Sequence, residues 1–133
     1  MSGAPAWSEW PVCHLASIAD PGAHGFLIGD GDWPFRGFVV RNGDSVHAYA
    51  NICPHARHPL DLLPDDFLSR DGDMIRCGSH GALFRANSGE CVLGPCVGAN
   101  LLRLDLRIDA DDMVLVRAPE SMRDEHLTAW TGL

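Results

Sequence analysis

Apolar and polar residues alternate in short runs along most of this chain, and no convincing helical period of apolar residues appears before residue 118. The clearest alternation covers residues 102–108, where leucine or isoleucine at even positions alternates with arginine or aspartate at odd positions. A period of two places apolar side chains on one face of a strand and polar side chains on the other. We therefore predict a half-buried strand at 102–108, a turn at 109–112 and a second strand at 113–117.

Shorter apolar runs separated by turn residues predict further hairpins. Residues 38–41 and 46–51 flank Asn42-Gly43-Asp44, a sequence that strongly favours a tight hairpin turn. Three more short strands are expected at 74–77, 82–85 and 90–93. Together these elements predict an all-β fold of antiparallel sheets.

The two ends and an acidic stretch differ in character from the rest. Residues 1–9 are expected to form a loose tail. Ser121 followed by Asp124 resembles a capping box, so we predict a short C-terminal helix over residues 122–130. Residues 61–73 are rich in aspartate and are expected to form an exposed loop.

Composition limits the classes of partner. The chain has 133 residues, which suits one compact domain covering 1–133. Its 18 acidic residues against 10 basic ones give a formal net charge of −8, whereas nucleic acid and anionic membranes require a cationic face. We expect neither partner. No apolar run is long enough to span a bilayer and the N-terminal sequence does not resemble a signal peptide, so we expect a cytoplasmic protein.

Cysteine and histidine occur in two close pairs, Cys53-Pro54-His55 and Cys77-Gly78-Ser79-His80. Five cysteines, an odd number, argue against a disulfide framework in a cytoplasmic protein and favour metal binding. Each pair follows a predicted strand and enters a turn rich in glycine or proline, so two loop tips can face each other around a metal. A zinc finger would need histidines on a helix, which is absent here, but structural zinc bound by the same four residues stays open.

At these positions the chain resembles the Rieske-type [2Fe–2S] ferredoxins. The resemblance rests on residues 53–60 (CPHARHPL), residues 77–84 (CGSHGALF) and residues 94–95 (GP), and it extends over roughly residues 35–117. It implies an antiparallel fold in which a cluster-binding subdomain, residues 50–97, is inserted between strands of a base.

The resemblance also implies a ligand set. Cys53 and Cys77 would hold one iron, and His55 and His80 the other, with one cluster per chain. Pro95 would lie in a loop that shields the cluster from water. None of these roles follows from the spacing alone.

Two thiolates and two neutral imidazoles leave the oxidised site without net charge, whereas four thiolates make it more negative and harder to reduce. Centres with mixed ligands accordingly span about −150 to +300 mV, against about −400 mV for plant-type ferredoxins. Respiratory Rieske proteins place a hydroxyl and a tyrosine, which hydrogen-bond toward sulfur, where this chain has Ala82 and Phe84. We therefore predict a midpoint potential at the low end of that range.

Three functions are compatible with these features. The first is a one-electron carrier that passes electrons from a flavin reductase to a terminal oxygenase, as an electron-transfer component rather than a catalyst. It is favoured because the chain ends soon after the last predicted strand, which leaves no room for an oxygenase's mononuclear-iron domain. The second is a small or accessory subunit of a larger redox enzyme such as a nitrite reductase. The third is a zinc-binding interaction module.

Other residues of the same types receive simpler interpretations. Cys13, Cys91 and Cys96 are expected to be buried apolar thiols without a redox role. Arg57 and His58 lie in the first ligand motif, where a docking role and simple exposure to solvent are equally compatible with the sequence.

Overall fold

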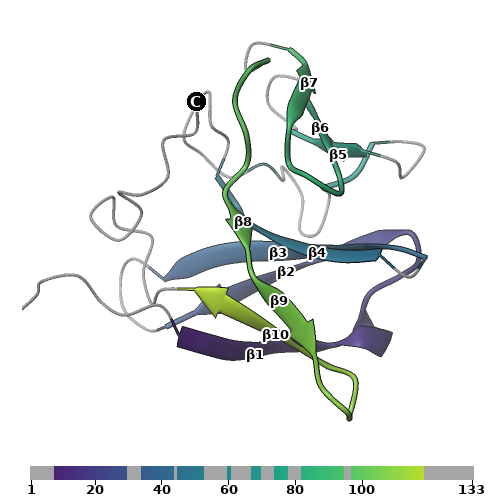
Figure 1. Cartoon of the computed structure of the whole chain (residues 1–133), viewed down its shortest axis with the longest axis vertical. Helices are drawn as coiled ribbons and strands as arrows, with labels where there is room; N and C mark the ends of the chain where they lie inside the picture. Colours follow the sequence, from purple (N-terminus) through teal and green to yellow (C-terminus); the bar gives the residue numbers. More distant parts are fainter. Residues whose placement is uncertain are drawn as a thin grey trace, which may run out of the picture.

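The computed structural model describes residues 8–29, 34–43, 45–52, 60, 67–69, 74–77, 82–94 and 97–118. Over these residues the strands form three antiparallel sheets, and no α-helix is present among them. Figure 1 shows the sheets as three layers, with β2, β3 and β4 in the middle one. No helix within these ranges is long and apolar enough to cross a bilayer.

The first sheet has the order β1-β10-β9 and comprises β1 (Ser8–His14), β10 (Met113–Ala118) and β9 (Leu106–Ile108). The second has the order β2-β3-β4-β8 and comprises β2 (Gly22–Ile28), β3 (Phe35–Asn42), β4 (Ser45–Ala50) and β8 (Arg103–Leu104). The third has the order β5-β6-β7 and comprises β5 (Met74–Arg76), β6 (Leu83–Arg85) and β7 (Cys91–Leu93). A single 3-10 turn, Leu15–Ser17, links β1 to β2. We call the first two sheets the base.

The second sheet is buried on both faces, because it separates two hydrophobic cores. Along β3, Phe38 packs into the core shared with the third sheet, and its neighbour Val39 packs into the core shared with the first. On β4, Tyr49 packs into the same core as Phe38, and its neighbour Ala48 packs into the same core as Val39. A strand segment covered on both faces needs apolar residues at successive positions, and β3 accordingly has four consecutive buried residues, Gly37–Val40, while β4 ends with three, Ala48–Ala50.

Most of the predicted hairpins are confirmed. β3 and β4 pair as far as Asn42↔Ser45, and Gly43 in the turn has a positive φ of 63°. The three short strands predicted after residue 73 correspond to β5, β6 and β7. The turn at 109–112 is also present, where Oδ1 of Asp109 accepts hydrogen bonds from the backbone N–H groups of Asp111 and Met113.

The strand predicted at 102–108 is not continuous. Leu104 pairs with Ala48 in the second sheet, whereas Leu106 pairs with Val116 in the first, so the chain changes sheets at Asp105. The alternation holds for Leu104, which is buried, but Ile108 at the far end is 37% exposed. The alternating pattern therefore predicted the direction of the side chains but not the break between sheets.

Two further predictions need correction. The predicted N-terminal tail is too long, because Ser8 already belongs to β1 and Nε1 of Trp10 donates a hydrogen bond to the backbone oxygen of Ala118 at 3.1 Å. Part of the acidic stretch 61–73 is buried rather than exposed. Phe67 is 0% exposed and its ring stacks on that of Phe38, with 4.2 Å between centroids. The predicted helix at 122–130 lies outside the residues that the structure describes.

Candidate metal centre

Of the four predicted ligands, the structure describes Cys77. This residue follows β5 directly and its side chain is fully buried, at 0% exposed. Cys53, His55 and His80 lie outside the described residues, as does Pro95. The geometry of the site is therefore built from the residues at which each ligand loop begins and ends.

The first loop begins where β4 ends. The backbone N–H of Asn51 donates to the oxygen of Arg36 at 2.9 Å, which continues the pairing of β4 with β3. Its side-chain Oδ1 accepts a hydrogen bond from the backbone N–H of Leu60 at 2.7 Å. Asn51 thus joins the two ends of the loop that contains Cys53 and His55. Sequence reasoning missed this role, because one asparagine after an apolar run does not by itself indicate that its side chain closes a loop.

The second loop is closed by the main chain. In the β5–β6 hairpin, Arg76 pairs with Leu83, which places Cys77 and Ala82 opposite each other at one end of the third sheet. The backbone N–H of Cys77 donates to the oxygen of Ala82 at 2.9 Å. Ala82 is itself fully buried. The loop that carries His80 therefore leaves from a hydrogen-bonded pair in the protein interior.

The third loop starts at Gly94, which lies against Ala82 at the end of the second loop. Gly94 follows β7 with a φ of 101°, and a Cβ at this position would lie 2.9 Å from Cα of Ala82. Glycine is required here both by its conformation and by this close approach. The start of the Gly94-Pro95 loop is thus held beside Cys77 and Ala82. On either side of this loop, Leu93 is 56% and Val97 64% exposed.

The remaining described cysteines lie in apolar surroundings. Cys91 is buried, and its thiol donates to the backbone oxygen of Leu93 at 3.4 Å, as expected for a structural thiol. Cys13 is only partly buried, and this burial raises the pKa of its thiol. Neither forms a disulfide, and nor does Cys77. Cys96 lies outside the described residues.

Tyr49 connects the base to the third sheet. Its hydroxyl donates to the backbone oxygen of Ala86, in the turn after β6, at 2.7 Å. The side chain is fully buried, and this burial raises the pKa of Tyr49 to about 12. A neutral phenol is therefore maintained as a hydrogen-bond donor between the two parts of the molecule.

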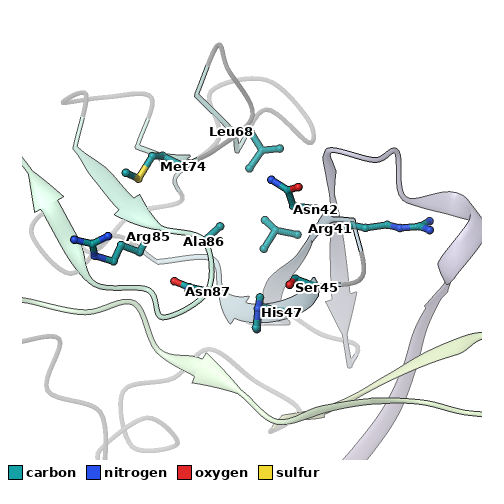
Figure 2. Close-up of a pocket in the computed structure, with 10 residues that line it drawn as sticks. Arg41, Asn42, Ser45, His47, Leu68, Met74, Arg85, Ala86 and Asn87 are labelled. Carbon is teal, nitrogen blue, oxygen red and sulfur yellow. The ribbon is translucent and has the colours of Figure 1, made fainter.

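A cavity of about 320 Å³ lies between the β3–β4 hairpin and the third sheet (Figure 2). It is lined by Met74 and Arg85, which pair at the end of the sheet opposite Cys77. Figure 2 shows Arg41 and Arg85 extending away from the cavity. Arg41 donates to backbone oxygens after β1, and Arg85 pairs with Glu90. Neither cationic group therefore points into the cavity.

Among the described residues, no group of three or more histidine, cysteine, aspartate or glutamate side chains converges to hold a metal. These residues form the ends of the loops around the site. The two loops that carry the motifs leave from buried, hydrogen-bonded positions, and the glycine loop starts against Ala82. A metal cluster with cysteine and histidine ligands requires buried cysteine side chains and surroundings that exclude water and hold the ligand loops. The residues present therefore fit such a group, and fold and loops together define an all-β, cluster-binding class of protein.

Comparison with known proteins identifies the family. Residues 8–119 match the family model described as the Rieske [2Fe-2S] domain, and the chain belongs to this family. Its cofactor is accordingly a [2Fe–2S] cluster rather than zinc, and the expected antiparallel fold is confirmed. None of the curated protein sequences matches the chain.

Three solved structures illustrate the range of proteins with this fold. The ferredoxin of carbazole 1,9a-dioxygenase from Nocardioides aromaticivorans IC177 is 27% identical with a TM-score of 0.63, and the match covers 85% of this chain and 99% of that one. The terminal oxygenase of carbazole 1,9a-dioxygenase from Novosphingobium sp. KA1 is 18% identical with a TM-score of 0.65, covering 85% of this chain and 30% of that one. A protein described as an NADH-dependent nitrite reductase small subunit from Mycobacterium tuberculosis is 20% identical with a TM-score of 0.57, covering 84% and 95%.

Proposed function

We propose that this protein carries single electrons from a flavin reductase to a terminal oxygenase in the cytoplasm, as an electron-transfer component rather than as a catalyst. The observation that carries this proposal is the match to a dioxygenase ferredoxin over 99% of that chain. The oxygenase, by contrast, is matched over only 30% of its length, so the shared part is the Rieske domain alone. Stopped-flow reduction by a flavin reductase, followed by transfer to an oxygenase, tests the proposal. Failure to accept electrons from any such reductase would contradict it.

We assign the cluster to the four side chains of the two motifs, Cys53, His55, Cys77 and His80. When bound, the cluster supplies one-electron redox chemistry at irons with no coordination position open to a substrate. Support comes from the burial of Cys77 and from the hydrogen bonds that close the two ligand loops. Residues 50–97 form the cluster-binding subdomain, and Pro95 shields the cluster as the residue after Gly94.

Substitution of each ligand by alanine tests this assignment. Each of the four variants should lose bound iron and acid-labile sulfide, because a cluster needs all of its protein ligands. Cys13→Ala is the matched control, since Cys13 lies in β1 and should keep full iron content. EPR of the dithionite-reduced protein should show a lower average g value than an all-thiolate cluster. A motif variant that retained full iron and this signal would contradict the assignment.

The side chains beside the second loop set the expected potential. Ala82 and Phe84 are both fully buried and neither carries a hydroxyl that can hydrogen-bond toward sulfur. We expect a midpoint near the low end of about −150 to +300 mV, and an upward shift in Ala82→Ser and Phe84→Tyr. Redox titration of the three proteins measures this. A parent midpoint well above 0 mV would contradict the prediction.

The exposed apolar residues beside the Gly94 loop are the best candidates for partner contact. Leu93 and Val97 are 56% and 64% exposed; Leu93 directly precedes Gly94, which packs against Ala82, and the backbone N–H of Val97 donates to the oxygen of Gly94 at 3.4 Å. Leu93→Asp and Val97→Asp should slow electron transfer to the oxygenase and leave the midpoint potential unchanged. Leu27→Asp is the control, because Leu27 is 62% exposed but lies on the outer strand β2 of the base. Equal effects of all three substitutions would argue against this surface.

The second candidate function is a small subunit of a larger redox enzyme. It is favoured by the match to a protein described as a nitrite reductase small subunit, which extends over 95% of that chain. A permanent subunit buries an apolar interface and stays with its enzyme through purification. Size-exclusion chromatography of the protein from its native source separates the two candidates, because a carrier elutes alone and a subunit elutes with a large partner.

A further inference from the structure

The loops that contain the proposed ligands are closed in different ways. The second loop is closed by a bond between two backbone groups, from Cys77 to Ala82, which no substitution of a side chain removes. The first loop is closed by the side chain of Asn51, whose Oδ1 accepts from the backbone N–H of Leu60 at 2.7 Å. Between the described ends of the first loop, the closing bond therefore depends on the side chain of Asn51.

Both partners in this bond are held in place independently of the loop between them. Asn51 is 8% exposed, and its own N–H is bound to the oxygen of Arg36 on β3. Leu60 is 0% exposed, and its side chain belongs to the core that contains Phe38 and Tyr49. The N–H of Leu60 thus lies in a place that water reaches poorly, where a donor without an acceptor is strongly unfavourable.

From these contacts we infer that Asn51 is a positioning residue for the cluster. By holding Leu60 next to the end of β4, it fixes the separation between the two ends of the 53–59 segment. This segment carries one thiolate and one imidazole of the proposed ligand set, one for each iron, so the inference rests on that assignment. The bond that carries this role is made to the backbone N–H of Leu60, at the end of the loop.

The test compares three variants of the intact, cluster-loaded protein. Asn51→Ala removes the acceptor and leaves the N–H of Leu60 unpaired, so the cluster should be lost to a chelator about tenfold faster. The g values and the midpoint potential should shift as well, because the ligands no longer hold one geometry. Asn51→Asp keeps an oxygen at the same position and should restore both the half-life and the g values. Asn42→Ala is the control, since Asn42 is exposed at the other end of β3.

Some outcomes would overturn the inference. A cluster in Asn51→Ala with the parent's half-life, g values and potential would show that the bond has no positioning role. Loss of thermal stability alone, with an unchanged spectrum and potential, would reduce Asn51 to a structural residue. If Asn51→Ala fails to fold, Asn51→Gln keeps the amide but displaces its oxygen, and the same measurements apply. The alanine variants of Cys53 and His55 are measured in parallel, so a wrong ligand assignment is recognised separately by their retained iron.

Discussion

The base and the proposed cluster-binding subdomain are built from the same antiparallel pairing, but they differ in how much of it they contain. In the base, β2 and β3 are strands of 7 and 8 residues, paired from Gly22↔Arg41 to Ile28↔Phe35. In the subdomain, β5, β6 and β7 are each 3 residues long. Strands of globular proteins usually have about 5–6 residues, so the strands of the third sheet are at the short end of the usual range.

The two regions also differ in what supplies their interior. The base has a core of its own between its two sheets. The subdomain packs on a core that it shares with the outer face of the second sheet, through Phe38 and Tyr49. We therefore expect the base to keep its structure without the subdomain, whereas the subdomain should depend on the base and on the cluster. The predictions below test this division.

Removal of the cluster should have the largest effect. Cys77→Ala removes one of the four proposed ligands, and metal binding is coupled to the folding of the region that the metal joins. Amide hydrogen exchange should show strong loss of protection in β5–β7 and little change in β3, β4 and β10. Cys91→Ala is the control, because Cys91 is also buried in the third sheet but is not a proposed ligand. A uniform loss of protection across both regions would show that the division is wrong.

The packing of Gly94 on the second loop should give the next largest effect. Gly94 and Gly98 have nearly equal φ values, 101° and 98°, but only Gly94 has an atom within 4 Å of an added Cβ. Gly98→Ala should therefore lower the free energy of unfolding by about 1 kcal/mol, through backbone strain alone. Gly94→Ala should lower it by about 2–4 kcal/mol, because overlap with Ala82 is added. Denaturant titration measures both, and equal losses would show that Ala82 yields without strain.

The same division explains what the sequence could predict. Hairpins of the subdomain were recognised because local turn residues and short apolar runs define them. The region 102–108 was correctly predicted to be extended, but not its division into β8 and β9 at Asp105. That division depends on pairing with Ala48 and Val116, which lie 57 positions before and 11 positions after Asp105. β1 and β2 were missed because neither has a regular alternation, and β1 pairs with a strand at the opposite end of the chain.

The site was predicted unevenly for a related reason. Cysteine and histidine at close spacing are visible as a motif, and Cys77 indeed lies buried at the end of a strand. The residues that hold the loops are not visible in this way. Asn51 accepts from a backbone group nine residues later, and Gly94 is required by its close approach to Ala82, which precedes β6. Such contacts are properties of the folded chain, and a single sequence does not encode them as a pattern.

Removal of the hydrogen bond between Tyr49 and Ala86 should reduce the free energy of unfolding by a smaller amount. It measures how strongly this bond stabilises the contact between the two regions. Tyr49→Phe should lower the free energy of unfolding at pH 7 by about 1 kcal/mol, because the carbonyl loses its donor. The pKa of Tyr49 is raised to about 12 from a usual value of 10. The unfolded chain therefore loses this proton first, and the parent protein loses stability as the pH rises from 10 through 12. Thermal unfolding as a function of pH should show that Tyr49→Phe lacks this component.

The smallest effect is expected within the base itself. Arg107 on β9 donates from Nε and Nη2 to the carboxylate of Glu9 on β1, at 2.7 and 2.8 Å, and so spans the strand β10 between them. The hydrogen bond from Arg107 lowers the pKa of Glu9, so the charged pair contributes most above the usual glutamate pKa and is lost as the pH falls through the lowered value. Both side chains are exposed, however, and solvent screens such a pair strongly. Glu9→Gln should leave the denaturation midpoint at pH 7 unchanged within error, at low and high salt alike. A clearly lower denaturation midpoint would mean that strand pairing and the core do not stabilise the base by themselves. The stability of the base without the subdomain would then depend partly on this surface ion pair.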